Sequence, residues 1–447
     1  MMETRDFLRP SLLISLLGIL GVTTLLLAQG EWVHMRPYPV VGADVNQRWE
    51  SEAVFWPTVI KDGDTLRMWY CGTDDVLGDG TVKIGYAWSR AGITWRRNPN
   101  NPVLEADLPW EFDQVISPVV LKDENGFHLW YGAGAIPSNI IGYATSRDGI
   151  HWVKHSEPVL QPGPQGSWDA DLLGPGAVLK VGNLYYMWYW GGQGKWPRAK
   201  IQIGLAISTN GINWIKYDDP ETPFPPFKFS DPVLTGGELG SWDFLRVWTP
   251  SVLKTEDGYE MWYAGREDGS LSAQMIGYAT SPDGIHWQKW EGNPVIAARP
   301  EWGFSYLSSS VLRFDEGYHM WYTSFIPSNV GERAGIGYAW SPAAPSNLLG
   351  GPPAPKGFAL LGNFPNPFNS RTEIQFSLPA PTWVTLKIYD ATGRLVRTLL
   401  NGLHQRGNFR VAWDATDDLG RTVSSGVYLY RLEAGTFTRT RKMLLVK

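Results

Sequence analysis

A Trp-Tyr pair recurs five times along the chain, and this repetition limits the possible folds more than any other feature. Each pair is followed by Ile-Gly-Tyr-Ala or a close variant. In the first four repeats a tight turn ending in Gly, a Trp and a Pro-Val segment come next. The pairs are Trp69-Tyr70, Trp130-Tyr131, Trp188-Tyr189, Trp262-Tyr263 and Trp321-Tyr322. With the strand expected before each pair, the pattern predicts four short strands per repeat, as in β-propeller blades.

The fifth repeat lacks its last part, and the start of the chain holds a matching segment. After Ala339-Trp340 there is no Gly-Ile-x-Trp turn and no Pro-Val-Leu. Trp32 and Pro39 have the same spacing as Trp95 and Pro102 in the first repeat and as Trp287 and Pro294 in the fourth. We therefore predict that the N-terminal segment forms the outer strand of the last blade. That pairing closes the ring and removes two exposed sheet edges.

The predicted fold class is all-β. A five-bladed β-propeller closed by an N-terminal strand covers residues 31–342, and a small Ig-like β-sandwich covers residues 362–447. Because antiparallel strands alternate in direction, the loops between the second and third strands of all repeats share one face. These loops vary in length and composition, whereas the opposite face carries the uniform turns. We place the binding face at the variable loops.

Composition supports an all-β chain and limits its partners. The 24 Trp, 19 Tyr, 49 Gly and 33 Pro combine strand-forming aromatics with turn formers. Trp and Tyr can stack on sugars, although most repeated Trp side chains are expected in the blade core. A net charge of −5 gives no support to a nucleic-acid partner. The single Cys71 excludes an internal disulfide and is expected to be a packed residue. The His residues show no metal-ligand spacing, so we expect no metal and no cofactor. We also expect a monomer.

The N-terminus resembles an export signal over residues 1–30. Arg5 and Arg9 precede an uncharged run from Ser11 to Leu27, and Ala28-Gln29-Gly30 offers a small-x-small cleavage site. A retained membrane anchor is the alternative, because the apolar run is near the lower length limit for a spanning helix. We expect a secreted or cell-surface protein.

A Pro- and Gly-rich linker is expected over residues 343–361, before the C-terminal domain. Apolar and polar residues alternate over 372–378, 383–389, 409–413 and 427–432, which predicts a small β-sandwich. The domain resembles the sorting domains of type IX secretion and the Ig-like domain of hook-capping proteins. The resembling residues are Asn363-Phe364-Pro365-Asn366-Pro367-Phe368-Asn369, Ile388-Tyr389-Asp390, Gly393-Arg394, Trp413-Asp414, Ser425-Gly426-Val427-Tyr428 and Lys442-Met443-Leu444-Leu445-Val446-Lys447. The resemblance implies contact with a secretion machinery, and an accessory Ig-like module is the alternative.

The repeat region resembles the propellers of glycoside hydrolase families 43, 32 and 130. Met-Trp-Tyr, Ile-Gly-Tyr-Ala and Asp-Gly-Ile-x-Trp with Pro-Val-Leu carry the resemblance, which implies carbohydrate as substrate. The catalytic motifs of these families do not match. Where family 43 has Asp-Pro and Glu-Gly-Pro, this chain has Trp56-Pro57 and Leu173-Gly174-Pro175, and Ser117-Pro118 stands in place of the Asp-Pro of family 130. The Trp-Met-Asn-Asp-Pro signature of family 32 is absent.

Two sets of acidic residues follow the Trp that opens each of the first four repeats, at Trp49, Trp110, Trp168 and Trp242. Three positions after that Trp, three consecutive repeats carry Glu52, Asp113 and Asp171, and the fourth carries Leu245. Because this set is asymmetric, we predict that it is the catalytic carboxylate set of a glycosidase, without assigning acid and base. Acids at the solvated start of a strand, without a catalytic role, are the alternative. One position after the Trp, four repeats carry Glu50, Glu111, Asp169 and Asp243, which we interpret as architectural, either exposed acids or turn formers.

Further residues of the expected binding face are candidates for contacts with substrate. Trp196 and Trp248 could form sugar platforms, and charged side chains could bind hydroxyls or carboxylates. The charged candidates are Arg198, Arg246, Arg266, Asp74 and Asp75. The leading hypothesis is therefore an exported glycoside hydrolase acting on an oligo- or polysaccharide. A non-catalytic propeller that binds glycan or protein at the cell surface is the alternative, and a scaffold that uses the ring only as a spacer is a third.

Overall fold

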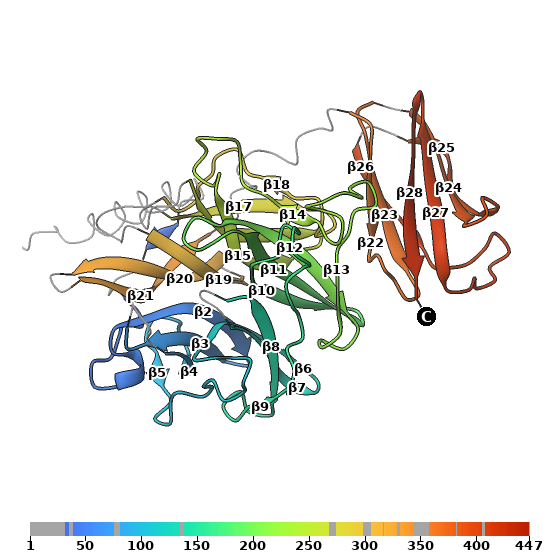
Figure 1. Ribbon diagram of the computed structural model, residues 1–447. Coiled ribbons are helices and arrows are strands. Elements are labelled where there is room, and N and C mark those ends of the chain that lie inside the picture. Colours follow the sequence, from blue (N-terminus) through green and yellow to red (C-terminus); the bar gives the residue numbers. More distant parts are fainter. Residues whose placement is uncertain are drawn as a thin grey trace, which may run out of the picture.

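The computed structural model describes most of both expected domains (Figure 1). The described ranges are 32–34, 39–75, 81–134, 138–267, 274–297, 305–315, 317–328, 331–342, 357–380, 382–404 and 407–446. The expected signal segment and residues 343–356 of the expected linker lie outside them. Within these ranges the chain is nearly all β, and no helix is long and apolar enough to cross a bilayer.

The strands of the repeat region form successive antiparallel groups that follow the repeats. The first repeat forms β2 (Ala53–Asp62), β3 (Thr65–Thr73), β4 (Val82–Ser89) and β5 (Arg96–Arg97). The second forms β6 (Val115–Asp123), β7 (Gly126–Ala133), β8 (Ile140–Ser146) and β9 (Val153–Lys154). The third forms β10 (Leu172–Val181), β11 (Leu184–Gln193), β12 (Lys200–Ser208), β13 (Trp214–Lys216) and β14 (Pro232–Leu234). The fourth forms β15 (Arg246–Lys254), β16 (Tyr259–Arg266), β17 (Met275–Ser281) and β18 (Gln288–Lys289).

The fifth repeat takes its outer strand from the start of the chain. It forms β19 (Ser305–Phe314), β20 (Gly317–Ser328) and β21 (Gly331–Ser341), and β1 (Val33–His34) pairs antiparallel with β21. Val33 lies opposite Trp340, and Val41 bridges to Ile336 further along the same strand. The spacing of Trp32 and Pro39 therefore predicted a pairing between segments at opposite ends of the repeat region.

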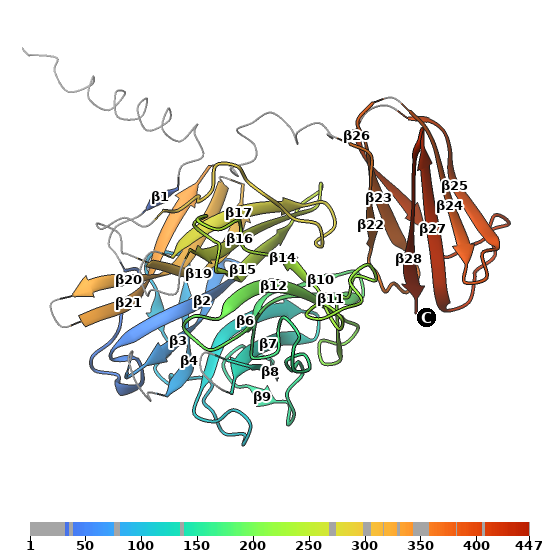
Figure 2. The same cartoon turned by 45° about the horizontal axis from the view of Figure 1, so that its top comes forward.

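The first strands of the groups contact one another in sequence order, and β19 also contacts β2 (Figure 2). In the described part of the chain, five edge-to-face Trp pairs link each repeat to the next, with ring centroids 6.0–6.4 Å apart. These pairs are Trp69–Trp152, Trp130–Trp214, Trp188–Trp287, Trp262–Trp32 and Trp321–Trp95. The repeated Trp residues are thus packing residues, because all five Trp of the Trp-Tyr pairs are fully buried.

Hydrogen bonds reinforce four of these contacts. The indole N–H of Trp69 donates to the carbonyl of Gly149, at 2.7 Å, in the tight turn of the next repeat. Trp130 and Trp188 make the same bond to Gly211 and Gly284. The indole of Trp321 donates to Gly92 of the first repeat, at 2.7 Å. A glycine is required at these turns, since its φ is positive and the indole leaves no room for a Cβ.

The four acids that directly follow the opening Trp are buried, which corrects the expectation that they are exposed. Asp169 shows the arrangement: its Oδ2 accepts from Tyr189 at 3.1 Å and from Lys216 at 2.6 Å, on the second and outer strands of the same group. Glu50, Glu111 and Asp243 bind a Tyr and a basic residue in the same way. Burial is tolerated because each charge is paired and hydrogen-bonded. The architectural role was predicted correctly.

The fifth repeat replaces this arrangement. Gly303 follows its opening Trp302, so no carboxylate is available at that position in the sequence. The hydroxyl of Tyr322 instead lies 2.6 Å from Nδ1 of His34 on β1. His34 follows Trp32 by the same spacing as Lys216 follows Trp214. The N-terminal segment thus supplies both the Trp and the polar partner that the other repeats draw from their own outer strands.

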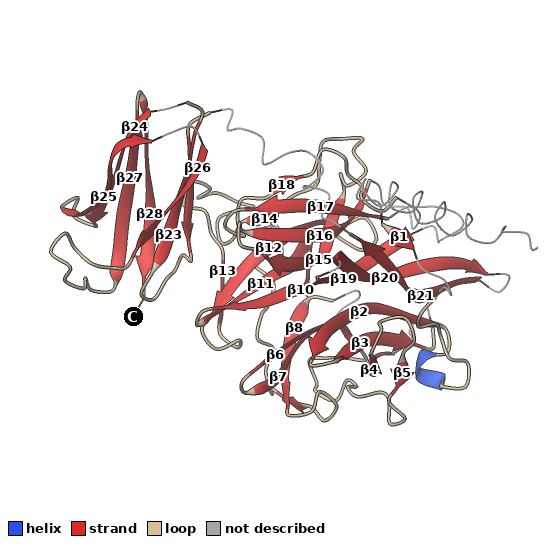
Figure 3. Ribbon diagram, turned by 180° about the vertical axis from the view of Figure 1, so that it is seen from behind, coloured by secondary structure: helices blue, strands red, loops and turns tan. Residues whose placement is uncertain are grey.

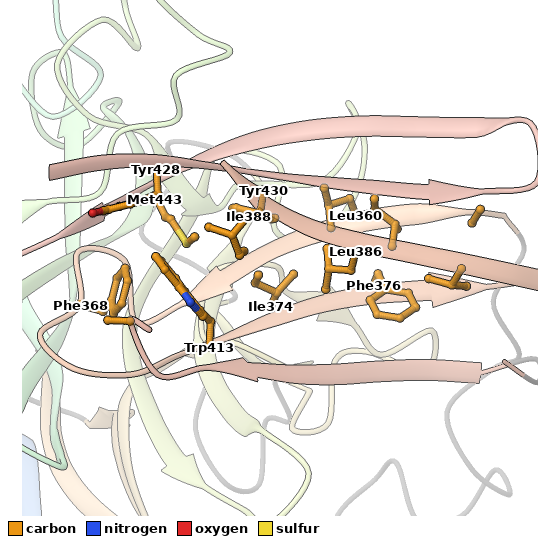
Figure 4. Close-up of a cluster of buried hydrophobic side chains, with 14 of the residues drawn as sticks. Leu360, Phe368, Ile374, Phe376, Leu386, Ile388, Trp413, Tyr428, Tyr430 and Met443 are labelled. Atoms are coloured by element: carbon orange, nitrogen blue, oxygen red, sulfur yellow. The ribbon is translucent and has the colours of Figure 1, made fainter. Parts of the chain in front are cut away.

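The C-terminal domain is a sandwich of two antiparallel sheets (Figure 3). One sheet contains β22 (Ala359–Phe364), β23 (Thr372–Leu378) and β26 (Gly407–Trp413). The other contains β25 (Leu395–His404), β24 (Thr382–Asp390), β27 (Gly426–Ala434) and β28 (Phe437–Leu445). Alternation predicted β23, β24, β26 and β27, whereas β22, β25 and β28 had not been predicted. In the core, Trp413 packs between Phe368 and Tyr428, with ring centroids 5.6 and 5.1 Å away (Figure 4).

This domain contacts the repeat region where the tight turns lie. Gln375 donates to the carbonyl of Pro282 at 3.1 Å, and Arg439 pairs with Glu221 at 2.5 Å. Glu221 belongs to residues 217–231, a segment of the third repeat that is much longer than residues 98–101 and 290–293 in the equivalent places. Residues of both domains line a cavity of about 250 Å³. The C-terminal domain therefore rests on the third and fourth repeats (Figure 1).

Candidate functional site

The first strands of the repeats enclose a central channel with a cavity of about 150 Å³. Its lining is residues 56–60, 117–120, 175–179, 249–253 and 308–312. The polar side chains among them are Ser and Thr hydroxyls and one indole, and no side chain of this lining is ionisable. A charged group placed there would lack a counter-charge in the lining, so the cavity suits neutral polar ligands.

Each first strand has an irregularity where it reaches the variable-loop end, here called the mouth. The register between the first and second strands shifts in all five groups, at Phe55/Thr58 in the first. Trp56, Ser117 and Thr249 lie at these bulges with φ of 50°, 54° and 45°, and each precedes a proline. A positive φ is unfavourable for β-branched and bulky residues, and such strain concentrates at functional sites. The bulges therefore turn side chains toward the mouth at a cost in stability.

Three buried polar atoms at the mouth have no hydrogen-bond partner within the described ranges. They are Nε1 of Trp56, Nε1 of Trp190 and Oγ1 of Thr249. These side chains are at most 6 % exposed. Ser117, at the equivalent bulge, is satisfied because its hydroxyl donates to the carbonyl of Pro175 at 3.1 Å. Unsatisfied buried polar groups are costly, and each requires an explanation such as a bound ligand.

The position of Trp190 follows from a glycine. Gly174 precedes Pro175 and is the third repeat's equivalent of Trp56, Ser117 and Thr249, and a Cβ there would lie 2.2 Å from Cζ2 and 2.9 Å from Nε1 of Trp190. The indole edge therefore fills the place where the other repeats put their own side chain. Trp56, Ser117 and Thr249 thus line the channel cavity, and the indole of the buried Trp190 packs against Gly174.

Trp248, which directly precedes Thr249 on β15, is the centre of an aromatic cluster. Its ring centroid lies 6.3 Å from that of Trp56, 5.9 Å from Trp190 and 5.6 Å from Trp196. The guanidinium of Arg246 lies 4.2 Å from the centroid of Trp196. Stacking and cation–π contacts of this kind hold the aromatic side chains in fixed orientations.

The structure brings together four of the predicted substrate-binding residues. Arg246, Trp248 and Arg266 are at most 1 % exposed, and Trp196 covers them as a half-buried side chain. Arg246 and Arg266 are cross-strand neighbours on β15 and β16. Trp248 presents no open face, and its indole donates to Gln274 at 3.0 Å. Sugar stacking at this cluster would therefore use Trp196.

Three other predicted binding residues, Asp74, Asp75 and Arg198, lie in the variable loops around the mouth, here called the rim. Asp74 is paired with the exposed Arg48 at 3.4 Å. Asp75 and Arg198 are exposed, and their loops belong to the first and third repeats. Arg198 shares the loop of the third repeat with Trp196, whereas Asp74 and Asp75 belong to the loop of the first repeat.

The predicted catalytic carboxylates lie just before the first strands begin, and they do not line the channel cavity. The backbone N–H groups of Glu52 and Asp171 donate to the equivalent carbonyls of Thr73 and Gly192, each at 3.1 Å. The alignment from the sequence is thus structurally correct for these two. Glu52 is half-buried, and Asp113 and Asp171 are exposed. Oδ2 of Asp171 accepts from the N–H of Gly194 at 2.7 Å, which ties it to the loop that carries Trp196.

Sequence reasoning missed the donors at the mouth. Trp56 and Ser117 were considered only as departures from family motifs, and Trp190 and Thr249 were not considered. The recurring X-Pro dipeptides of the first strands could have marked these positions. Cys71 lies below them as the packed residue that was expected: its sulfur accepts from the N–H of Ser117 at 3.3 Å, and burial raises the pKa of its thiol.

The comparisons with known proteins agree with this architecture. Residues 366–436 match the family model of the FlgD Ig-like domain. An uncharacterized protein of Mycobacterium tuberculosis is 28% identical over 194 residues, which are 41% of this chain and 62% of that protein. A 1,2-β-oligomannan phosphorylase of Thermoanaerobacter is 30% identical over 134 residues, 27% of this chain and 44% of the enzyme. The chain thus matches less than two thirds of the length of these relatives.

Solved structures show the same fold at low identity. A glycosyl hydrolase from Bacteroides ovatus has a TM-score of 0.55 at 17% identity, covering 69% of this chain and 93% of that one. A structure from work on mannoside phosphorylases and hydrolases of glycoside hydrolase family 130 has a TM-score of 0.53 at 17% identity, covering 69% and 93%. The repeat region therefore has the fold of these glycosidase propellers. Of the three resembling families, family 130 is the one named for a matching structure.

Proposed function

We propose that this chain is an exported carbohydrate-active enzyme, in which a five-bladed propeller closed by β1 binds a sugar at the mouth of its channel and cleaves a glycosidic bond there. The cyclic contacts of the first strands support the blade count, and the five Trp pairs support the closure. The secretory character rests on residues 1–30, and the C-terminal domain is proposed to engage a secretion machinery or the cell surface. An accessory Ig-like module remains the alternative for that domain.

The unpartnered donors at the mouth carry the proposal that this is where sugar binds. The N–H of Trp56, the N–H of Trp190 and the hydroxyl of Thr249 can each donate to an oxygen of a bound molecule. Sugar hydroxyls and ring oxygens supply such acceptors at close spacing, and Trp196 offers an adjacent aromatic ring. The uncharged cavity suits a neutral sugar unit, and its small size suits the end of a glycan rather than a long internal stretch.

Cleavage requires carboxylates, and Glu52, Asp113 and Asp171 are the proposed set. One protonated carboxyl gives its proton to the leaving glycosidic oxygen, while an ionised carboxylate activates the attacking water. The Thermoanaerobacter relatives act on β-1,2-mannosides with phosphate, judged by their names. We therefore propose mannosides as the first substrates to test, with either water or phosphate as the attacking group.

A second candidate function is favoured by one specific observation. No carboxylate lines the channel cavity, and two of the three proposed catalytic acids are exposed at the rim. A propeller that binds a glycan end without cleaving it needs the donors at the mouth and no carboxylate in the cavity. Binding without turnover is therefore the alternative that the experiment must separate from catalysis.

The test is the release of sugar from a panel of β-1,2-mannosides, plant polysaccharides and microbial polysaccharides, with and without inorganic phosphate. We expect release by the parent protein and a loss of at least about a hundredfold in the variant Glu52→Gln/Asp113→Asn/Asp171→Asn. Asp64→Asn is the matched control, because Asp64 is an exposed acid at the opposite end of the first repeat. Full activity of the triple variant would reject these residues, and binding without release would select the non-catalytic function.

The binding site is tested separately from catalysis. Thr249→Val and Trp56→Phe remove one donor each; valine keeps the shape of threonine, and phenylalanine keeps an aromatic ring. If the donors bind sugar, each variant should weaken glycan binding by about tenfold, as expected for a lost buried hydrogen bond. Calorimetric titration measures this, and unchanged affinity in both variants would contradict a sugar site at the mouth.

A further inference from the structure

Phe112 combines two features that rarely occur together on a protein surface. Its side chain is 69% exposed, and its φ is +54°. Of the five non-glycine residues with positive φ within the described ranges, Trp56, Ser117, Thr249 and Ala415 are buried, so Phe112 is the exposed one. An aromatic residue in the left-handed region is strained, and exposure gives it no packing energy in return.

The backbone on both sides of Phe112 is firmly held. Before it, Glu111 is fully buried and accepts from Tyr131 at 2.6 Å and from Lys154 at 2.7 Å. After it, the buried Gln114 donates to the carbonyl of Gly134 at 2.9 Å. These contacts fix the unfavourable conformation, and they leave the ring exposed, next in sequence to the exposed Asp113 and shortly before the first strand β6.

The equivalent positions of the other repeats differ. Ser51 and Ala170 stand there in the first and third repeats, and Phe244 in the fourth is half-buried. None of these three has a positive φ. Phe304, the equivalent residue of the fifth repeat, lies outside the described residues. Among the four repeats that the structure describes at this position, the strained and exposed ring occurs in the second alone, so the repeated framework does not require it.

We propose that Phe112 is a stacking platform for a sugar ring outside the channel mouth, with the carboxylate of Asp113 accepting hydrogen bonds from hydroxyls of the same glycan. This rests on the proposed binding of a glycan end at the mouth. A flat apolar ring beside a carboxylate complements a sugar, which has apolar C–H faces and hydroxyl edges. The platform extends the site from the terminal sugar to the following units, so it selects oligosaccharides over short sugars.

The experiment measures binding of β-1,2-mannobiose and β-1,2-mannotetraose to the full chain by calorimetry. Phe112→Ala is expected to weaken mannotetraose binding by about tenfold and mannobiose binding by less than about twofold. Phe112→Trp should keep the preference for the longer chain. Phe224→Ala is the matched control, because Phe224 is 76% exposed on the segment 217–231 of the third repeat. This substitution should change neither affinity.

A second measurement separates a binding role from a structural one. Phe112→Gly and Phe112→Ala both remove the ring, but only glycine removes the backbone strain. We therefore expect a higher melting temperature for Phe112→Gly than for Phe112→Ala, with the same loss of mannotetraose affinity in both. Unchanged mannotetraose affinity in both variants would overturn the platform while leaving the proposed function intact. Failure of the parent to bind these sugars or any glycan of an array would overturn both.

Discussion

Two sets of carboxylates lie two residues apart at the start of the first strands, and they differ in burial and in their ion pairs. The framework acids, Glu50, Glu111, Asp169 and Asp243, are buried, and each is bound to a Tyr and a basic residue. The rim acids, Glu52, Asp113 and Asp171, are exposed or half-buried, and none forms an ion pair within the described ranges. A shift of two residues along the chain thus separates groups that hold the fold from groups free to meet a ligand.

The comparison teaches that the repeated residues serve the framework, whereas the residues of the proposed site are those at which the repetition is interrupted. The framework acids recur in four repeats because each must join the second and outer strands of its own group. The rim acids stop after three repeats, and a strained aromatic ring like that of Phe112 occurs in one of the four repeats described at that position. The same contrast holds at the mouth, where the hydroxyl of Ser117 is satisfied and that of Thr249 has no partner in the described part of the chain.

The largest effect on stability is expected from breaking a framework pair. Asp169→Ala leaves the partly buried Lys216 without its carboxylate and Tyr189 without its acceptor. We expect the free energy of unfolding to fall by about 3–5 kcal/mol, measured by urea denaturation. Asp169→Leu combined with Lys216→Met should recover most of this loss, because no charge then remains buried. A loss below about 1 kcal/mol in the single variant would show that the framework acids are not structural.

A smaller effect is expected from pH at Glu50. Burial raises the pKa of the Glu50 carboxyl, while Arg97 and the Tyr70 hydroxyl act against this. The folded chain therefore binds the proton more tightly than the unfolded chain does. The stability from this group is complete below the unfolded pKa and is lost as pH rises through the folded pKa. Relative to Glu50→Gln, the parent should gain unfolding free energy as pH falls from 7.5 toward about 4.5. A parallel pH dependence of the two proteins would contradict the raised pKa.

The smallest effect on stability is expected at the rim. Glu52→Gln and Asp171→Asn should each change the free energy of unfolding by no more than about 0.5 kcal/mol, because their side chains reach solvent. Both should nevertheless reduce sugar release, so that stability and activity separate. Thermal unfolding and the activity panel measure the two effects on the same preparations. A large loss of stability at either position would place that acid with the framework.

The repeats predicted the strand groups and the pairing of the N-terminal segment, because side-chain spacing repeats wherever the same packing recurs. The burial of the framework acids was not predicted, since their basic partners come from the outer strand. A signal for it exists, because Arg97, Lys154, Lys216 and Lys289 each follow an outer-strand Trp at the same spacing. The mouth was harder to foresee. That Trp190 takes the place of a side chain at Gly174 depends on two strands meeting in space, which no local pattern records.

The C-terminal domain touches the repeat region at Pro282 and Glu221, on the side where the tight turns lie and away from Trp56 and Thr249. It is therefore attached to the side of the repeat region opposite the mouth. If a cell surface or a transport complex binds this domain, the mouth faces away from that support. A polymer too large to slip between the protein and its support can then still present its end to the channel.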